Sequence, residues 1–329
     1  MSSLPIRTRK LKVGVMRGGP SSEYDVSLKT GSNVMKTLRD RHEVRDIFID
    51  RQGRWHIDGI ERTPERILPH VDVIFNAMHG TYGEDGQVQK ILESHKVPYT
   101  GSNALASALG MNKWFSKKYF RDHGLHTPRG LLFRPHSYDD RLLDSVLEDF
   151  RGAVVVKPVS AGSSIGVSLA RDPHSFAQAL DQAFQYSPDA LAEEYLAGRE
   201  ATCGVVEGSR PGELYALPPV EIRNTSSEKD IWGYEAKYAD ELHELVCPGN
   251  FSAQEKHALE DMAVRAHKAL GLRHYSRSDF MVTPQGIYIL ETNTLPGITS
   301  ASLFPKALSA VGVHLHEFLD HVLELAIRN

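Results

Sequence analysis

The chain has 329 residues, 41% of them hydrophobic and 24% charged, and a formal net charge of −4. This composition is typical of a soluble globular protein of two or three domains and provides no basic footprint for nucleic acid. The sequence contains no apolar run of membrane-spanning length, no signal-peptide core, and only two cysteines, too few for a disulfide framework or a zinc pattern. We therefore expect a cytoplasmic protein that binds neither nucleic acid nor a membrane.

Strand and helix patterns alternate over about the first hundred residues. Strands are predicted at Leu11 to Met16, in "VRDIFID" and in "VDVIFNAMHG", and a helical pattern separates the first two. "GQVQKILESHKVPYTG" predicts a helix followed by a short strand. Such alternation predicts a doubly wound parallel sheet, in which ligands bind beyond the carboxyl ends of the strands. The turns Gly18-Gly19 and His79-Gly80 fall at that edge.

The rest of the chain is less regular. One long helix is predicted over "ALASALGMNKWFSKKYFRDHGL", ending at Gly124, and the first domain boundary lies near it. Two strands then flank a Gly/Ser-rich loop, a helix capped by Asp172 follows, and "DALAEEYLAGREATCGVV" predicts a strand, a hinge-like turn and a strand. "EIRNTSSEKDIWGYEAKYADELHELVCPGN" has the composition of one long mobile loop. A helix, the strands "YSRSDFMV" and "GIYILETN", and a C-terminal helix complete the chain.

Polar side chains two residues apart occur on both late strands. Side chains with this spacing share one face of a strand. A three-residue loop, 284–286, would pair Asp279 with Glu291 and Arg277 with Asn293. Two carboxylates and an amide oxygen on one patch suit Mg²⁺. The same residues also fit a solvated strand face or an ion pair with Arg277.

The stretch "VVVKPVSAGSSIG" places Lys157 at the end of a β-branched strand, directly before glycines and serines. Glycine lets backbone N–H groups approach phosphates, and serine hydroxyls add donors. The sequence has neither the Walker pattern nor a G-x-G pair, so this is not a P-loop or a Rossmann fingerprint. An ordinary hairpin loop is the alternative. In the same way, "GYEAKYADE" fits a lid over a phosphate or a plain surface loop.

Two residues of the first hundred also admit two interpretations. Glu23 follows the Gly-Gly turn, where a carboxylate at a helix N-terminus is favourable for purely structural reasons. His79 in "HGTYGEDG" fits a turn histidine. The sequence has no G-x-S-x-G elbow and no H-E-x-x-H, so hydrolase and zinc-protease chemistry have little support.

Seven motifs taken together resemble one known family. "GGPSSEYDVSLKTG", "HGTYGEDG", "VKPVSAGSSIG", "EEYLAGRE", "GYEAKY", "SRSDF" and "ETNTLPGITSASL" occur in the order and spacing of the D-alanine–D-alanine ligases of the ATP-grasp superfamily. The resemblance runs from Val13 to Leu303. One departure is Asn112, where the family usually has aspartate; it leaves the contact that the family makes through Lys113 in place.

The resemblance implies an α/β fold, with α+β character in the ATP-grasp part. It implies an N-terminal doubly wound parallel-sheet domain at residues 1–104, a small ATP-grasp domain at 105–192 and a C-terminal ATP-grasp domain at 193–329. It further implies ATP-dependent ligation of two D-alanines through an acyl phosphate, for peptidoglycan precursor synthesis, with two Mg²⁺ or Mn²⁺ ions and a homodimer. The alternative is an ATP-grasp ligase that uses a different amino or hydroxy acid as acceptor.

The resemblance also assigns residues. Those implied around ATP are Lys113, Lys157, Ser164, Glu193, Glu194, Tyr195, Leu196, Glu200 and Lys237. The implied metal ligands are Asp279, Glu291 and Asn293. The first D-alanine is implied beside Glu23 and His79, the second beside Ser302 and Leu303, and the developing oxyanion at Arg277 and the Gly297 backbone. Tyr238 on the lid would reach Ser163 and Glu23, and a tyrosine there resembles ligases that make D-alanyl-D-alanine rather than an ester with D-lactate.

Overall fold

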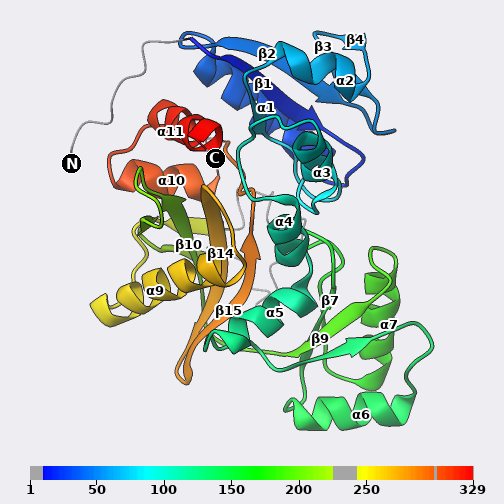
Figure 1. Cartoon of the computed structure of the whole chain (residues 1–329). Coiled ribbons are helices and arrows are strands. Elements are labelled where there is room, and N and C mark those ends of the chain that lie inside the picture. The colour runs from blue at the N-terminus through cyan, green and yellow to red at the C-terminus, as the bar shows by residue number, and fades with distance from the viewer. Residues whose placement is uncertain (1–9, 225–242, 300–301, 329) are drawn as a thin grey trace.

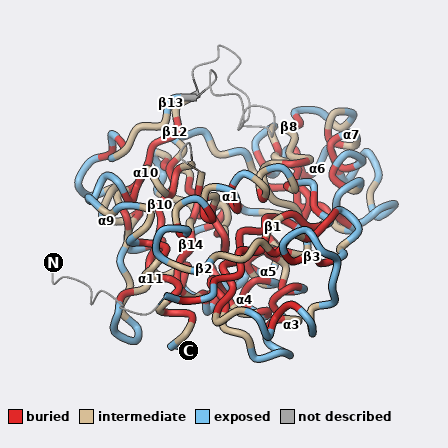
Figure 2. The backbone as a smooth tube through the Cα atoms, turned by 90° about the horizontal axis from the view of Figure 1, so that it is seen from above, coloured by how far each residue is buried: buried red, intermediate tan, exposed pale blue. Residues whose placement is uncertain are grey.

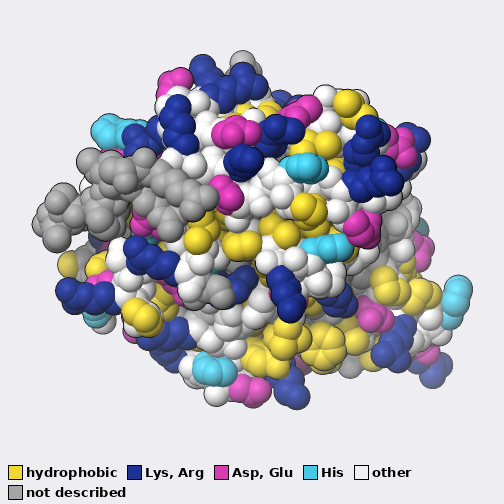
Figure 3. Space-filling model, turned by 45° about the horizontal axis from the view of Figure 1, so that its top comes forward, with side chains coloured by type: hydrophobic (Ala, Val, Ile, Leu, Met, Phe, Trp, Pro, Cys, Tyr) yellow, Lys and Arg dark blue, Asp and Glu magenta, His cyan; other side chains and the backbone are white. Residues whose placement is uncertain are grey.

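The computed structural model describes residues 10–224, 243–299 and 302–328. This part of the chain forms three β-sheets with helices packed against them (Figure 1). Buried segments are concentrated along the strands and on the inner faces of the helices (Figure 2). On the face shown in Figure 3, lysine and arginine side chains are interspersed with acidic ones rather than gathered into one stripe. In the described ranges, no helix is both long and apolar enough to cross a membrane.

The first sheet has the strand order β4-β3-β2-β1-β5. Strands β1 (Lys12–Gly18), β2 (Glu43–Ile49) and β5 (Val73–Asn76) are parallel, which confirms the prediction of a parallel sheet for this part of the chain. Strands β3 (Trp55–Ile57) and β4 (Ile60–Glu61) add an antiparallel edge that the sequence analysis missed. They are too short for a period-of-two pattern to be visible.

Helices cover both faces of this sheet. Val13 and Val15 pack in a core with α1 (Tyr24–Leu38), whereas Met16, the residue after Val15, packs with α3 (Gln87–Ser94) on the other face. The short helices α2 (Pro64–Ile67) and η1 (Leu68–His70) precede β5. The predicted C-terminal helix is two helices, α10 (Leu303–Ala310) and α11 (Leu315–Arg328). The second of these packs against α1 and β5, so the chain end returns to the first sheet (Figure 1).

The second sheet has the order β6-β9-β7-β8 and is antiparallel throughout. Its strands are β6 (Gly130–Phe133), β7 (Val154–Pro158), β8 (Ser168–Ala170) and β9 (Ala190–Glu194). Helices α6 (Asp140–Asp149) and α7 (Pro173–Phe184) complete its core. Asp172 caps α7, as predicted, in a reciprocal capping box with Ser175.

The third sheet has the order β13-β12-β10-β14-β15, with β11 paired to β10. Its strands are β10 (Arg199–Glu207), β11 (Leu214–Ala216), β12 (Val220–Asn224), β13 (His243–Val246), β14 (Tyr275–Thr283) and β15 (Gly286–Asn293). Helix α9 (Ala253–Ala269) packs on it. The predicted long loop therefore begins and ends in paired strands, β12 and β13, because backbone pairing needs little apolar content at a sheet edge.

The long helix predicted before Gly124 is two helices, α4 (Ala104–Met111) and α5 (Lys113–Asp122). Asn112 separates them with an extended backbone, φ −88° and ψ 103°, and its side-chain oxygen accepts the Phe115 N–H. An asparagine side chain competes with helical hydrogen bonding in this way and favours an N-cap. The break lets α5 start beside β7, where the Lys113 N–H donates to the Val159 carbonyl at 2.9 Å.

Candidate active site

The hairpin of β14 and β15 carries the predicted polar patch. Asp279 pairs with Glu291 and Arg277 with Asn293, which confirms the predicted register. The predicted three-residue loop is wrong, since Thr283 pairs with Gly286 and leaves a two-residue loop. A β-bulge between Asp279 and the next pair inserts one extra residue and restores the same register. The bulge therefore decides which side chains face each other.

Each carboxylate of the patch meets a cation. Arg277 Nε and Nη2 donate to the two oxygens of Asp279, each at 2.9 Å, and Thr202 Oγ1 donates to Asp279 Oδ1 at 2.7 Å. Burial lowers the pKa of the Arg277 guanidinium, but Asp279 outweighs burial and the net shift is upward. Glu291 Oε2 lies 3.2 Å from Lys113 Nζ. The ion pair between Arg277 and Asp279 that the sequence left open is thus present.

Two cavities meet at this patch. The α1 cavity, of about 800 Å³, lies between α1, the Gly/Ser loop, the ends of β14 and β15, and the start of α10. The β7–β9 cavity, of about 600 Å³, lies between the second and third sheets. Lys113, Ala161 and Glu291 line both cavities, so a ligand in one can meet a ligand in the other at these residues.

The β7–β9 cavity gathers every residue implied around ATP that lies in the described ranges. These are Lys113, Lys157, Ser164, Glu193, Glu194, Tyr195, Leu196 and Glu200. Lys157 Nζ lies 2.5 Å from Glu193 Oε2. Burial opposes both charges, but the pair outweighs it: the pKa of Lys157 is raised and that of Glu193 lowered. The predicted Lys237 lies outside the described residues.

Lys117 is a residue of this region that the sequence analysis missed. Its Nζ lies 2.5 Å from Glu193 Oε1, so one buried carboxylate meets two lysines. Burial lowers the pKa of Lys117 to about 8. The available signal was its spacing: Lys117 is four residues after Lys113, and residues four apart share a face of a helix.

The α1 cavity brings Glu23 against the Gly/Ser loop. Ser163 Oγ donates to Glu23 Oε2 at 2.6 Å, across 140 positions of sequence. Glu23 is the N-cap residue of α1, but its carboxylate is directed to Ser163. A Cβ built on Gly162 would lie 2.3 Å from Glu23 Oε1, so only glycine leaves room for this approach. Ser163 and Ser164 have φ of +50° and +56°, a conformation that costs free energy and needs support from its surroundings.

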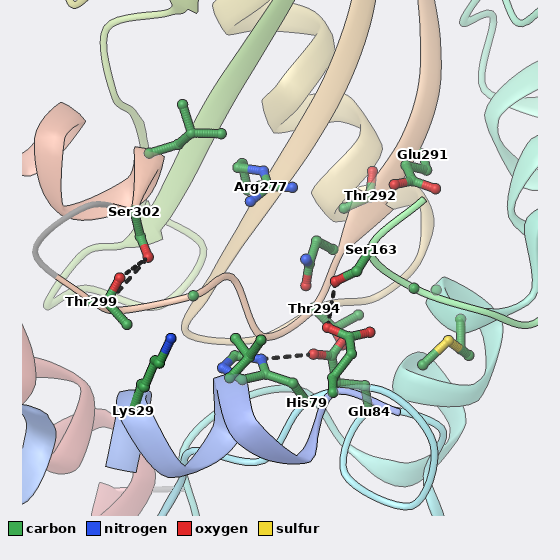
Figure 4. A pocket seen from close by; sticks show the side chains of 18 of the residues that line it. Lys29, His79, Glu84, Ser163, Arg277, Glu291, Thr292, Thr294, Thr299 and Ser302 are labelled. Atoms are coloured by element: carbon green, nitrogen blue, oxygen red, sulfur yellow. Dashed lines mark hydrogen bonds and ion pairs between the residues drawn. The ribbon is translucent and has the colours of Figure 1, made fainter. Parts of the chain in front are cut away.

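His79 lies on the floor of the same cavity and is buried. Its Nε2 lies 2.9 Å from Thr30 Oγ1. Its Nδ1 lies 3.1 Å from Glu84 Oε1 (Figure 4). Burial lowers the pKa of His79, but Glu84 outweighs it and raises that pKa above its ordinary value. Glu84 is a second residue that the sequence analysis missed, although it lies within the quoted motif "HGTYGEDG".

The remaining predicted residues lie around the same space. Gly297, Ser302 and Leu303 line the α1 cavity together with Arg277. Ser302 Oγ lies 2.7 Å from Thr299 Oγ1 and accepts the Thr299 N–H at 3.1 Å (Figure 4). Tyr238 lies outside the described residues.

The predicted metal ligands lie on the wall between the cavities. Asp279 lines the β7–β9 cavity, Asn293 the α1 cavity, and Glu291 both. Asn293 Oδ1 accepts the Leu295 N–H at 3.1 Å. Over the ranges that the structure describes, no three His, Cys, Asp or Glu side chains converge as a metal site. Two carboxylates and one amide still form a set of hard oxygen donors, which fits Mg²⁺ completed by phosphate oxygens.

A cavity held between two antiparallel sheets, lined by buried lysines and carboxylates and joined to a doubly wound domain, defines the ATP-grasp class of protein. Comparison with known proteins specifies the family. Residues 12–67 and 58–102 match the model described as D-ala D-ala ligase N-terminus, and residues 120–324 match that for D-ala D-ala ligase C-terminus. The chain belongs to the D-alanine–D-alanine ligase family.

Individual relatives agree over nearly the whole chain. The D-alanine–D-alanine ligase of Pelotomaculum thermopropionicum is 37% identical over 97% of this chain and 98% of its own length. That of Geobacter sulfurreducens is 38% identical over 95% and 93%. The solved D-alanine-D-alanine ligase from Coxiella burnetii has a TM-score of 0.83 and 26% identity, covering 98% of this chain and 95% of its own. The VanG D-Ala:D-Ser ligase from Enterococcus faecalis has a TM-score of 0.81 and 27% identity, covering 97% and 100%.

Proposed function

We propose that this protein joins two D-alanine molecules into D-alanyl-D-alanine with cleavage of ATP to ADP and phosphate, for peptidoglycan precursor synthesis. The observation that carries the proposal is the meeting of the two cavities at Lys113 and Glu291. ATP in the β7–β9 cavity would direct its terminal phosphate to that junction. A D-alanine in the α1 cavity would present its carboxylate there.

The first step activates an unreactive carboxylate. Glu23 accepts the ammonium of the first D-alanine, and His79 lies beside it. A carboxylate oxygen attacks the terminal phosphorus, the bond from that phosphorus to the bridging oxygen of ADP breaks, and an acyl phosphate forms. Negative charge on the phosphate oxygens is stabilised by Lys113, Lys157 and backbone N–H groups of the Gly/Ser loop.

The second step forms the amide. The free amine of the second D-alanine, placed by Ser302 and Leu303, attacks the acyl carbon. The bond from that carbon to the phosphate oxygen breaks, and inorganic phosphate leaves with the proton that the amine nitrogen releases. Arg277 and the Gly297 N–H stabilise the oxyanion that develops on the carbonyl oxygen. The raised pKa of Arg277 supports this role because the guanidinium stays charged.

Water must be excluded while the acyl phosphate exists, because water would hydrolyse it. We assign this task to a lid that carries Lys237 and Tyr238, with Tyr238 directed to Ser163 and Glu23. We further assign Asp279, Glu291 and Asn293 as the residues that would hold two Mg²⁺ or Mn²⁺ ions, which supply positive charge against the phosphate oxygens.

The proposal also covers the domain boundaries, the cellular location and the oligomeric state. The domains are the N-terminal domain at 1–104, the small ATP-grasp domain at 105–192 and the C-terminal domain at 193–329. The protein acts in the cytoplasm, where ATP is available, and forms a homodimer. Light scattering after gel filtration tests the homodimer, and a monomer mass would refute it.

A substrate panel tests the function. Phosphate release and product mass are measured with D-alanine, L-alanine, D-serine and D-lactate, singly and in pairs. We expect D-alanyl-D-alanine to form fastest, and activity with L-alanine alone would refute the proposal. The structural likeness to a D-Ala:D-Ser ligase makes D-serine the most informative competing acceptor.

A further inference from the structure

Lys117 is a buried ammonium group to which the proposed reaction gives no role. It lies on α5, is 1% exposed, and sits behind the wall of the β7–β9 cavity. A buried lysine is costly unless an anion compensates its charge. We therefore expect an anion close to Lys117 that compensates its charge.

The compensating anion is Glu193 on β9, and each of its two carboxylate oxygens lies beside a different lysine. Lys117 Nζ lies 2.5 Å from Oε1, and Lys157 Nζ lies 2.5 Å from Oε2. Glu193 is itself 1% exposed and pairs with Gly130 on β6, where an added Cβ would come within 3.2 Å of Glu193 Cγ. Packing on one side and two ammonium groups on the other hold the carboxylate in one place.

Helix α5 presents two lysines on one face, and they reach different sheets. Lys113 Nζ donates to the Ala161 carbonyl at 2.6 Å and lies 3.2 Å from Glu291 on the third sheet. Lys117, one turn later, reaches Glu193 on the second sheet. One helix therefore ties together the two walls of the β7–β9 cavity (Figure 1).

The charges of this cluster do not cancel. Two ammonium groups and one carboxylate leave a net charge of +1, and of the two lysines it is Lys157 that lines the cavity. Without Lys117, Glu193 and Lys157 would form a closed pair of zero net charge. The full negative charge of Glu193 would then act on Lys157, beside the weaker contributions of Glu291 and Glu200, and the positive charge that an anion in the cavity meets would be smaller.

We propose that Lys117 is a positioning residue for the nucleotide: it holds Glu193 from behind and keeps the net charge of the cluster positive, so that Lys157, although paired with Glu193, still attracts a polyphosphate in the β7–β9 cavity. This inference rests on the proposed function, since it takes ATP as the ligand of that cavity. Lys117 acts through Glu193 and Lys157 and does not itself touch the nucleotide.

The substitution Lys117→Met tests the inference because it removes the charge and keeps most of the length. Nucleotide binding is measured by titration calorimetry with ATP in the absence of D-alanine. We expect the Kd for ATP, and the KM for ATP, to rise about tenfold. We expect kcat and the KM for D-alanine to stay within about twofold of wild type, because Lys117 is remote from the reacting atoms. Lys118→Met, at the exposed neighbouring position of the same helix, is the matched control and should change neither.

Two further variants separate this role from a merely structural one. Lys117→Arg keeps the charge and should hold the Kd within about threefold of wild type. In a Glu193→Gln background, Lys117→Met should add little, because the double-mutant cycle removes the group through which Lys117 acts. An unchanged Kd in folded Lys117→Met, or full additivity in the cycle, would overturn the inference.

If Lys117→Met does not fold, as judged by circular dichroism, the wild-type protein provides the test. Burial lowers the pKa of Lys117 to about 8, and the groups facing it are Glu193 on β9, Lys157 on β7 and, through space, Glu291 on β15. ATP affinity should therefore weaken as pH rises from about 7.5 to 9.5, and a flat profile would overturn the inference. A wild-type protein that binds ATP and forms no dipeptide would refute the proposed function and leave this binding test intact.

Discussion

The two cavities are assembled in different ways. In the β7–β9 cavity, Glu193 and Lys157 come from neighbouring strands of one sheet and form a buried ionic cluster with Lys117. In the α1 cavity, Glu23 meets a serine hydroxyl 140 positions away, and it does so because Gly162 lacks a side chain. The comparison teaches that the first cavity is sensitive to a change of charge and the second to a shift of backbone.

The largest expected effect comes from Glu291, which lines both cavities. Glu291→Gln keeps the shape and removes the charge that faces Lys113 and would hold the metal. We expect kcat to fall by at least about 10³ while ATP binding is partly retained. Steady-state phosphate release measures kcat, and calorimetry with ATP measures nucleotide binding. Glu148→Gln, at an exposed position of α6, is the control, and near-normal turnover of Glu291→Gln would refute the metal role.

Glu23→Gln should affect the α1 cavity alone. Loss of the carboxylate removes the charged partner of the substrate ammonium, so kcat/KM for D-alanine should fall about 100-fold. The Kd for ATP should be unchanged, because Glu23 lies outside the lining of the β7–β9 cavity. Asp25→Asn, at an exposed position of the same helix, is the matched control. A parallel loss of ATP affinity would show that the two cavities are not separable in this way.

Gly162→Ala tests the backbone requirement of the α1 cavity without changing any charge. The new Cβ would lie 2.3 Å from Glu23 Oε1, so the loop or the carboxylate must move. We expect a loss of about tenfold in kcat/KM for D-alanine, since small misplacements of a binding group weaken orientation. Equal kinetics in wild type and variant would mean that the contact between Glu23 and the Gly/Ser loop is dispensable.

The smallest expected effect concerns the free energy of unfolding and comes from a residue outside both cavities. His267 on α9 is buried against Ser276, with its Nδ1 2.8 Å from Ser276 Oγ, and burial lowers its pKa to about 4. Because the unfolded chain binds this proton more readily, the stability is present above about pH 6.5 and is lost as pH falls toward 4. Between pH 7 and 5 we expect a loss of about 1–2 kcal/mol from this residue.

Urea unfolding at the two pH values measures this loss. His267→Gln should flatten the pH dependence, and His257→Gln, at an exposed position of the same helix, should leave it as in wild type. An unchanged slope in His267→Gln would assign the acid sensitivity to other groups.

Local patterns predicted the regular parts of the fold well. The parallel strands, the cap at Asp172 and the pairing of Asp279 with Glu291 agree with the structure. The single long helix was wrong because Asn112 uses its side chain to cap α5. The three-residue hairpin loop was wrong because a bulge, which leaves no mark on residue spacing, takes up the extra residue.

The sequence by itself determined the chemical inventory: seven ordered motifs, the absence of other catalytic patterns, and the alternation that places carboxylates and an amide on one face of a hairpin. Only the tertiary structure decided that Lys117 and Lys157 meet one carboxylate, that Glu23 reaches Ser163, and that Lys113 and Glu291 lie where two cavities join. The physical reason is that these contacts join residues far apart along the chain. Their formation depends on how three sheets pack, and periodicity within one segment carries no information about that packing.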